Sequence, residues 1–357
     1  MAKTKTVGFG LLGAGLIAPF HAKSIRAADR CELVAVSDVD TMRAAKIAEQ
    51  FGCEARKTLN DLLADDRIDV IGILTPNHLH CEAALAAAKA GKHVLVEKPP
   101  AMSLKDTDAM IGACRAAGVA LGIVLQCRVR KPIQAMKRAI ADGRFGRLLQ
   151  ADAHMKWYRT PEYYRMDAWR SSRRSGAGVT IQHAFHYIDL LQYLMGPAAR
   201  VQARMSNLAH PDVQLEDTLN AFVDYAGGGQ GVVVASTALW PGTDIRIELH
   251  GESGTAIMVG ERMETWRFRD ERPEDDEVRK LGRASVATAA GGPADFDFAD
   301  HQVVIENMAE CARGNAEPII PATSARKTLE MALAMYKSAA AGTPVELPVV
   351  DEESIWR

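Results

Sequence analysis

Residues 7–22 read VGFGLLGAGLIAPFHA, and this stretch decides the fold. It opens with an apolar run of the length of a buried strand, Val7–Leu12. A glycine turn of the form G-x-G-x-x-A, Gly13–Ala18, follows and leads into a segment of helical character. In such a turn the first glycine permits the bend, the second lets the backbone approach a pyrophosphate, and the small third residue allows close helix–strand packing. Free N–H groups at the helix start can then hold phosphates, so the stretch predicts a dinucleotide site.

An acidic residue follows the next predicted strand at the spacing that such a site requires. Glu32–Ser37 reads as that strand, and Asp38 comes about 20 residues after the turn. A carboxylate there accepts a hydrogen bond from the ribose 2′-hydroxyl of NAD and repels the 2′-phosphate of NADP. Arg43 could soften that repulsion, so the sequence favours NAD and leaves NADP open. The cofactor residues predicted from this region are Gly13, Gly15, Leu16, Ile17, Ala18, Asp38 and Arg43.

The bulk properties favour a globular protein of two domains. The chain has 357 residues, 48% of them hydrophobic, and a formal net charge of −2. With charges this nearly balanced, the protein has no overall electrostatic field that would attract nucleic acid or a membrane surface.

The six cysteines are scattered without a CxxC pair, which indicates a reducing compartment and no disulfide framework. Lys3 and Lys5 before an apolar run imitate a signal peptide, but that run encodes the glycine turn. No run reaches the about 18 apolar residues of a membrane span. We therefore expect a cytoplasmic, unprocessed protein.

Strand-like and helix-like segments alternate in the first half of the chain, as a doubly wound parallel sheet requires. Ligands of such a sheet bind beyond the carboxyl ends of its strands. Two loops leave such ends, residues 75–80 (TPNHLH) and residues 97–100 (EKPP). We predict a dinucleotide-binding Rossmann domain at residues 1–126. The further strands that it should contain are Cys53–Arg56, Val70–Thr75, His93–Val96 and Ala120–Gln126.

Lys98 is the first candidate for catalysis. A lysine held beside a cationic nicotinamide ring has its ammonium form disfavoured, which eases proton exchange near neutral pH. Pro99 restricts the loop and would fix the direction of the lysine. The alternative is an ordinary surface lysine at the end of a strand.

From about Phe145 onward, consecutive strands are joined by short glycine turns, which is typical of an antiparallel sheet with helices on one side. The charge-dense Asp270–Lys280 predicts a solvated loop. We place a second α/β domain at residues 127–357. Its predicted strands are Leu149–Trp157, Val201–Ser206, Thr218–Tyr225, Gly231–Ala238, Ile245–His250, Thr255–Val259 and Glu264–Phe268, and its later helices are Phe298–Ala312 and Ser324–Ala340.

The predicted helix Val179–Met195 carries the second group of candidates. Helical spacing puts Gln182, His183, His186 and Asp189 on one side of it. His186 is a candidate general base because imidazole titrates near the working pH, and the alternative is a core histidine. Asp189 could orient it or cap structure elsewhere. The HxxHxxD spacing also invites a metal interpretation. A lysine and a histidine can handle the proton without one, and no cysteine cluster supports zinc, so no metal is predicted.

These motifs together resemble the Gfo/Idh/MocA oxidoreductases, the glucose–fructose oxidoreductase and inositol dehydrogenase family. The resemblance covers nearly the whole chain and depends on the order and spacing of four motifs. These are Gly13–Ala18 with His21, Thr75-Pro76-Asn77 with His80, Glu97-Lys98-Pro99, and His186-Tyr187-Ile188-Asp189 after a glycine run. It implies a Rossmann domain followed by an α/β domain whose open, mostly antiparallel sheet forms the interface of a homodimer or homotetramer.

The resemblance also implies roles for individual residues. It supports catalysis by Lys98 and His186. The family usually has an acid where this chain has Gln182, which can hydrogen-bond a substrate hydroxyl but cannot take its proton. The proton role therefore shifts toward His186 or Lys98. The further cofactor residues are Thr75, Pro76, Asn77, His80, Glu97, Lys98 and Gln126.

A finer likeness concerns aromatic and basic residues. Residues 156–164 (KWYRTPEYY), Trp169-Arg170 and residues 216–218 (EDT) look like those of UDP-N-acetylglucosaminuronate 3-dehydrogenases. Aromatic faces suit sugar rings, and Arg159 or Arg170 could meet a carboxylate or phosphate. The alternative is ordinary core and rim aromatics. The substrate residues so implied are Lys98, Arg128, Tyr158, Arg159, Trp169, Arg170, Gln182, His183 and His186.

We therefore expect an oxidoreductase that moves a hydride between NAD, or NADP, and the hydroxyl or keto carbon of a sugar, sugar acid or cyclitol. Its catalytic residues would be Lys98, His186 and Gln182. Two alternatives stay open. One is an NAD-binding regulator without turnover, which Gln182 keeps open, and the other is an NAD-dependent glycosidase of the same family.

Overall fold

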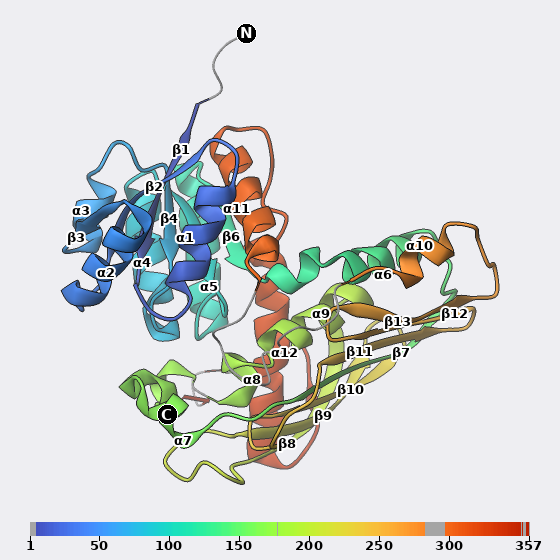
Figure 1. The fold of residues 1–357 in the computed structure, drawn as a ribbon. Helices are drawn as coiled ribbons and strands as arrows, with labels where there is room; N and C mark the ends of the chain where they lie inside the picture. The colour runs from blue at the N-terminus through green and yellow to red at the C-terminus, as the bar shows by residue number, and fades with distance from the viewer. Residues whose placement is uncertain (1–4, 177, 283–296, 351, 353–354, 357) are drawn as a thin grey trace. The chain divides into compact units, whose positions relative to one another are not determined.

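The computed structural model describes residues 5–176, 178–282, 297–350, 352 and 355–356, and the chain divides into two compact units (Figure 1). The first comprises residues 1–126 and 297–326, and the second comprises residues 127–296 and 327–357. The prediction divided the chain once, after residue 126, and left residues 297–326 with the second domain. They belong to the first unit because α11 (Ala299–Ala312) packs against α1 (Ala18–Ala27).

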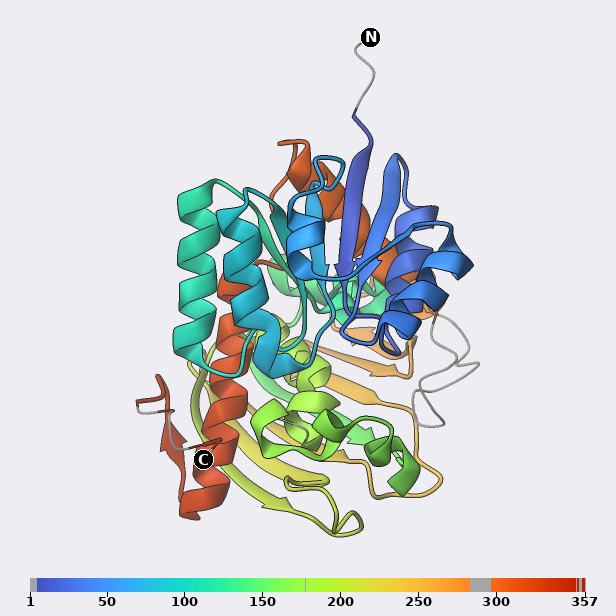
Figure 2. The same ribbon diagram turned by 90° about the vertical axis from the view of Figure 1, so that its left-hand side faces the viewer.

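A six-stranded, wholly parallel sheet forms the centre of the first unit, with helices on both faces (Figure 2). Its order, β3-β2-β1-β4-β5-β6, confirms the predicted doubly wound sheet. The strands are β1 (Val7–Leu12), β2 (Cys31–Ser37), β3 (Glu54–Arg56), β4 (Val70–Ile73), β5 (His93–Glu97) and β6 (Leu121–Val124). Besides α1 and α11, the helices are α2 (Thr41–Phe51), α3 (Leu59–Leu63), α4 (His80–Lys89) and α5 (Leu104–Ala117), with the 3₁₀ turns η1 (Asn77–Leu79) and η2 (Gln126–Val129) at strand ends.

Helices α2 and α5 of this unit begin and end at the residues that signal caps. The side chain of Asp40 accepts hydrogen bonds from two N–H groups in the first turn of α2, and Gly52 ends that helix in the left-handed conformation. The hydroxyl of Ser103 accepts one such bond, from the N–H of Asp106, and Gly118 ends α5 in the left-handed conformation. These capping residues determine where each of the two helices begins and ends.

An eight-stranded sheet forms the centre of the second unit, in the order β13-β12-β11-β7-β10-β9-β8-β14. Among the strand pairs of the described residues only β7 and β10 are parallel, so the sheet is mostly antiparallel as predicted. The two-residue β14 was not predicted. The strands are β7 (Leu148–Lys156), β8 (Ala198–Ser206), β9 (Thr218–Tyr225), β10 (Gln230–Ser236), β11 (Arg246–Gly251), β12 (Gly254–Val259), β13 (Arg262–Phe268) and β14 (Val345–Glu346).

Helices cover one face of this second sheet (Figure 1). Burial alternates along β9, where Ala221 and Val223 face the core and Phe222 between them is 67% exposed. No helix among the described residues is long and apolar enough to cross a membrane. The remaining helices are α6 (Lys131–Ala141), α7 (Pro161–Arg165), α8 (Val179–Gln182), α9 (Phe185–Met195), α10 (Asp275–Arg279) and α12 (Ala322–Ala341), with η3 (Ala168–Ser171) and η4 (Arg173–Ser175).

The predicted helix Val179–Met195 is two helices. The N–H of Ala184 bonds to the carbonyl of Val179 five residues earlier, at 2.8 Å, and the N–H of Tyr187 bonds back only three residues. This break in the regular hydrogen-bond ladder separates α8 from α9. Gln182 therefore ends α8, whereas His186 lies in the first turn of α9, so the uniform helical spacing expected for the candidates was wrong.

The charge-dense segment 270–280 is mostly exposed, as predicted, but it is not a loop throughout. It contains α10, in which Asp275 is fully buried. Arg144 donates to both carboxylate oxygens of Asp275 at 2.7 Å, and the indole N–H of Trp266 donates at 2.6 Å. Hydrogen bonds from Arg144 hold the pKa of Asp275 well below its usual range, although burial opposes this. A distant arginine thus allows one residue of a charged run to enter the core.

Candidate functional site

The glycine turn at the start of α1 has space for a ligand. Gly13 has a φ of 109°, and a Cβ there would lie 2.7 Å from the carbonyl oxygen of Leu74, so the turn needs glycine. At Gly15 a Cβ would meet no described atom within 4 Å. The backbone there is open to a neighbouring group, which fits the predicted pyrophosphate turn. The rest of the turn leads into the helix as exposed Leu16, half-buried Ile17 and fully buried Ala18.

Asp38 lies directly against this turn. One carboxylate oxygen accepts a hydrogen bond from the N–H of Ala14 at 2.6 Å, and the other accepts from the N–H of Asp40 at 2.8 Å. Arg43 forms an exposed ion pair with Asp40 at 3.3 Å. A half-buried negative charge is thus fixed at the end of β2, where the ribose of a dinucleotide is expected.

Replacing Asp38 with asparagine should weaken the preference for NADH over NADPH by roughly tenfold or more, because the charge that repels a 2′-phosphate is removed. The ratio of the two dissociation constants, measured by fluorescence titration, checks this without any substrate. The matched control is Asp40→Asn, two residues away, which keeps the helix cap and should leave the ratio unchanged. An unchanged ratio in the Asp38 variant would remove this residue from cofactor selection.

The two predicted loops are joined by a buried histidine at the start of α4. His80 Nδ1 lies 2.8 Å from the carbonyl oxygen of Pro99, and Nε2 lies 3.0 Å from that of Thr75. A neutral imidazole can donate to only one of these carbonyls, whereas an imidazolium donates to both. Burial lowers the pKa of His80, and the two carbonyl contacts oppose that shift. Either way, the loop after β4 is tied to the loop after β5.

Two predicted cofactor residues carry buried oxygen atoms that need a partner. Thr75 Oγ1 and Gln126 Oε1 have no hydrogen-bond partner within the described part of the chain. Buried polar atoms are almost always paired, so these atoms fit the hydroxyl or amide groups of a dinucleotide. Between them in sequence, Pro76 and the buried Asn77 lead into η1 at the same end of the sheet.

Glu97 is the last residue of β5, and Lys98 follows it in the chain. His21 of α1 donates from Nε2 to Oε1 of Glu97 at 2.8 Å, and the other carboxylate oxygen accepts from the N–H of Lys98 at 3.2 Å. Burial would raise the pKa of Glu97, but the bond from His21 and the charges of His21, His301 and Lys98 hold it at about 2. Glu97 is therefore a carboxylate that ties the loop to α1.

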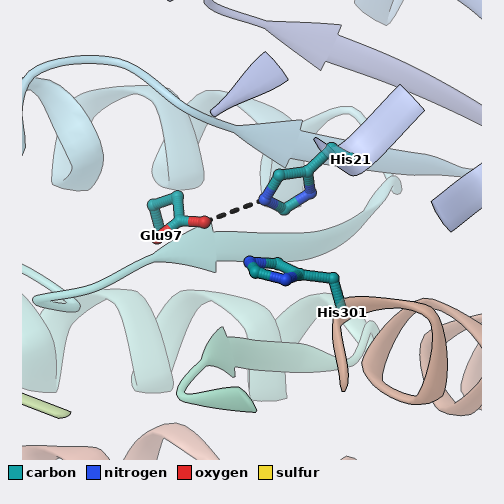
Figure 3. A group of neighbouring side chains, drawn as sticks. All are labelled: His21, Glu97 and His301. Carbon is teal, nitrogen blue, oxygen red and sulfur yellow. Dashed lines mark hydrogen bonds and ion pairs between the residues drawn. The ribbon is translucent and has the colours of Figure 1, made fainter. Parts of the chain in front are cut away.

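A third member of this group was not predicted. His301 of α11 is 4% exposed, and its ring lies edge-on to that of His21, with 5.5 Å between centroids (Figure 3). His21 itself was recognised only as part of a motif. A single histidine in an ordinary helix 280 residues further along the chain gives no local signal that would place it here.

In the second unit, Arg128 is part of a buried ion pair. It donates to both oxygens of Asp189, at 2.7 and 2.6 Å, and Thr328 donates to the same carboxylate at 2.7 Å. The guanidinium also lies 4.9 Å from the ring centroid of Tyr193. Of the two roles considered for Asp189, bonding elsewhere in the unit is the one observed. Because its guanidinium is bonded to Asp189, Arg128 has fewer hydrogen-bond donors left for a substrate than the prediction assumed.

A cluster of aromatic rings and arginines surrounds Tyr163. Arg159 and Arg170 lie 5.5 and 4.8 Å from the centroid of its ring, and Arg170 also donates to its hydroxyl at 2.9 Å. The ring of His183 lies 5.6 Å away, and Trp157 contacts both Arg159 and His183. Burial lowers the pKa of Arg159, and its neighbours Tyr163 and Tyr164 oppose this shift. The prediction included this stretch but not Tyr163 as its centre.

The other predicted substrate residues border this cluster. Trp169 stacks on Arg170 at 4.6 Å, and the carbonyl of Tyr158 accepts from Arg159 at 2.9 Å. The structure therefore groups most of the substrate residues that the finer likeness implied. The grouped residues are Tyr158, Arg159, Trp169, Arg170 and His183.

A buried glutamate anchors α8, the short helix that ends at Gln182. Glu216 accepts from the N–H of Thr180 and from the hydroxyl of Tyr336, each at 2.9 Å. A Cβ at Gly178 would lie 2.2 Å from this carboxylate, which explains why a glycine precedes the helix. Burial raises the pKa of Glu216. Gln182 and His186, in contrast, are both half-buried and retain surface for a ligand.

Comparison with known proteins matches both units. A family model described as an oxidoreductase family with an NAD-binding Rossmann fold matches residues 7–124, and one for the GFO/IDH/MocA C-terminal domain matches residues 133–257. The crystal structure of the WlbA dehydrogenase from Bordetella pertussis in complex with NADH and UDP-GlcNAcA is 31% identical, covers 98% of this chain and all of that chain, and has a TM-score of 0.89.

Curated relatives match at similar identity. The 1,5-anhydro-D-fructose reductase of Ensifer adhaerens is 29% identical over 95% of this chain and 98% of its own length. The inositol 2-dehydrogenase of Rhizobium meliloti is 30% identical over 72% of this chain and 77% of its own length.

Proposed function

Because the chain belongs to the GFO/IDH/MocA family of NAD-binding oxidoreductases, we propose that it transfers a hydride at a hydroxyl-bearing carbon of a nucleotide-linked sugar acid. The family supports the reaction type, NAD-dependent oxidation or reduction of a sugar or cyclitol hydroxyl. The narrower substrate class and the roles of the residues are proposals.

The arginine–aromatic cluster around Tyr163 carries the proposal for a sugar acid. Arg159 and Arg170 bring two guanidinium groups to one ring in a buried setting. Arginine is suited to bidentate binding of a carboxylate or phosphate, and aromatic faces suit a sugar ring. A neutral cyclitol would make no use of two cations. The relative solved with UDP-GlcNAcA, which is similar over nearly the whole chain, supports the same class.

Each residue has its own role in the proposed reaction. Bound NAD supplies the hydride acceptor, and Gly13, Gly15 and Asp38 would hold it. His186 takes the proton from the substrate hydroxyl, and Lys98 stabilises the developing alkoxide. Gln182 donates a hydrogen bond to a neighbouring hydroxyl without exchanging a proton. The overall reaction would convert the alcohol to a ketone, with one hydrogen leaving as a hydride to the bound dinucleotide and the other as a proton held by the protein.

A substrate panel tests the proposed class. The purified protein is mixed with NAD and with UDP-GlcNAcA, UDP-GlcNAc or myo-inositol, and NADH formation is followed by absorbance. We expect kcat/KM for the acid to exceed that for the neutral UDP-sugar by roughly 10²-fold, the value of one charge-assisted contact. Equal rates for the acid and the neutral sugar would contradict the proposal. Binding of NADH without turnover of any substrate would favour the regulator, and sugar release without net NADH would favour the glycosidase.

Arg170→Met should raise KM for the acid by roughly 10- to 100-fold and change KM for UDP-GlcNAc little, because only the acid loses an ionic partner. Arg165→Met is the matched control, since Arg165 is exposed and pairs with Asp212 on the surface. A rise in KM of the same size for both sugars would show that Arg170 supports the fold of the cluster and not the carboxylate.

We also propose that the protein is a cytoplasmic homodimer or homotetramer. The open face of the eight-stranded sheet carries the exposed Phe222, and an exposed aromatic side chain of this kind is suited to association. All six cysteines are free thiols, as expected in a reducing compartment.

A further inference from the structure

Two buried histidines contact the residues on either side of Lys98. On one side, His21 donates to the carboxylate of Glu97 at 2.8 Å. On the other, Nδ1 of His80 lies 2.8 Å from the carbonyl oxygen of Pro99. Their exposed fractions are 1% and 0%, so both contacts are made in the interior of the first unit.

We propose that His21 and His80 form a clamp that positions Lys98 for the hydride-transfer step, an inference that rests on the proposed function. Neither histidine needs to touch the substrate. They are positioning residues, because each acts through a neighbour of Lys98 in the chain.

The contacts on the Glu97 side form a continuous path. The ring of His301 packs edge-on against His21, which limits the orientations of that imidazole. His21 fixes Oε1 of Glu97 (Figure 3), and Oε2 of the same carboxylate accepts a hydrogen bond from the N–H of Lys98 at 3.2 Å. A carboxylate bridges the two bonds, so loss of His21 frees the group that holds the main chain of Lys98.

The contacts on the Pro99 side tie the loop to a second strand end. His80 also lies 3.0 Å from the carbonyl oxygen of Thr75, which follows β4. The loop that carries Lys98 is thereby bonded to α1 through His21 and to the end of β4 through His80. Positioning of this kind matters because a displacement of about 1 Å at a reacting group can cost about 10²-fold in rate.

His21, Glu97 and His301 together have the composition of a zinc site, but the distances between them favour the clamp. One ligand atom from each of His21, Glu97 and His301 lies within 4.8 Å of the others. Ligands at about 2.0–2.1 Å in a tetrahedral zinc site are about 3.3 Å apart. The observed 2.8 Å between His21 and Glu97 is shorter than this and is the length of a hydrogen bond. Nδ1 of His21 also has no hydrogen-bond partner among the described residues, whereas zinc-bound histidines usually bond through the second nitrogen.

Three variants test the clamp. His21→Ala removes the bond to Glu97, and His21→Gln places an amide donor near the position of Nε2. His93→Gln is the matched control, because His93 lies half-buried at the opposite end of β5 and contacts the N–H of Ala120. We expect kcat of His21→Ala to fall by roughly 30- to 100-fold while the Kd for NADH changes little. The glutamine variant should recover most of the loss, and the control should retain kcat.

Hydrogen exchange provides a readout that needs no turnover. In His21→Ala the amides of residues 96–103 should exchange at least several-fold faster than in the wild type and in His93→Gln. If the wild type turns over no sugar, the proposed function fails, and the exchange rates still decide the clamp. Unchanged exchange with unchanged kcat overturns it. A parallel loss of NADH affinity, failure of the glutamine variant to recover, or calorimetric binding of Zn²⁺ that His21→Ala abolishes would also overturn it.

Discussion

Replacing Lys98 with alanine is expected to lower kcat by roughly 10³-fold while NADH still binds with nearly wild-type affinity. The ammonium group stabilises charge that appears on the substrate oxygen only as the hydride leaves, so its loss raises the barrier more than it weakens binding. Steady-state kinetics with the preferred UDP-sugar, together with a fluorescence titration of NADH, separate the two quantities.

The control for this variant is Lys89→Ala, which removes an exposed lysine from the last turn of α4. That variant should retain kcat and stability. If Lys98→Ala kept wild-type turnover, Lys98 would be a surface residue at the end of a strand, and the mechanism would lose its first member. If NADH affinity fell in parallel with kcat, Lys98 would be a cofactor ligand without a role in the chemical step.

The second large effect is expected at His186. His186→Ala should lower the rate of alcohol oxidation by roughly 10²- to 10⁴-fold, the usual contribution of a positioned general base. An imidazole base must be neutral to accept the proton, so the wild-type rate should rise with pH through the range in which histidine titrates. The variant should lose that rise along with the rate, and a pH profile of kcat measures both.

His154→Ala is the matched control, because it removes a half-buried histidine from β7 in the same unit. Its pH profile should match that of the wild type. If the His186 variant kept the acid limb of the profile, the titrating group would lie elsewhere. Recovery of the rate by external imidazole in His186→Ala, and not in Lys98→Ala, would further distinguish the base from the electrostatic partner.

The fold could be predicted from the sequence where local chemistry alone determines it. The turn at Gly13 needs a positive φ, and α2 takes its cap from Asp40 and its end from Gly52, so each signal lies within the element that it defines. Strand-like runs separated by short glycine turns likewise defined most strands of the second sheet. These features depend on a few adjacent residues, and a single sequence contains them.

What the sequence did not provide depends on partners far along the chain. Asp275 enters the core because Arg144 pairs with it, and nothing near a run of charges announces that arginine. The break between α8 and α9 arises where Ala184 bonds to Val179, a local choice that helical periodicity does not reveal. Residues 297–326 join the first unit through packing of α11, which no motif signalled.

The residues of the candidate site also fall into those that the sequence identified and those that it did not. Lys98, His186 and the glycine turn could be named because each belongs to a compact motif with a known order. The contact of His21 with Glu97 spans 76 residues, and His301 comes from a helix still further along the chain. Arg159 and Arg170 meet at Tyr163 only because of how the chain folds through the two short helical elements α7 and η3. The sequence predicted which residue types could take part in the chemistry, but it did not predict which residues contact them.

A single-turnover experiment tests the central claim most directly. The protein, in excess over UDP-GlcNAcA, is mixed with NAD, the absorbance of NADH is recorded, and the sugar is analysed by mass spectrometry. We expect NADH to form in an amount equal to the sugar that has lost two hydrogen atoms, and a deuterium placed on the oxidised carbon to be found in the NADH. If the protein binds both cofactor and sugar but forms no NADH, or if the NADH carries no deuterium from the sugar, hydride transfer from the sugar is contradicted.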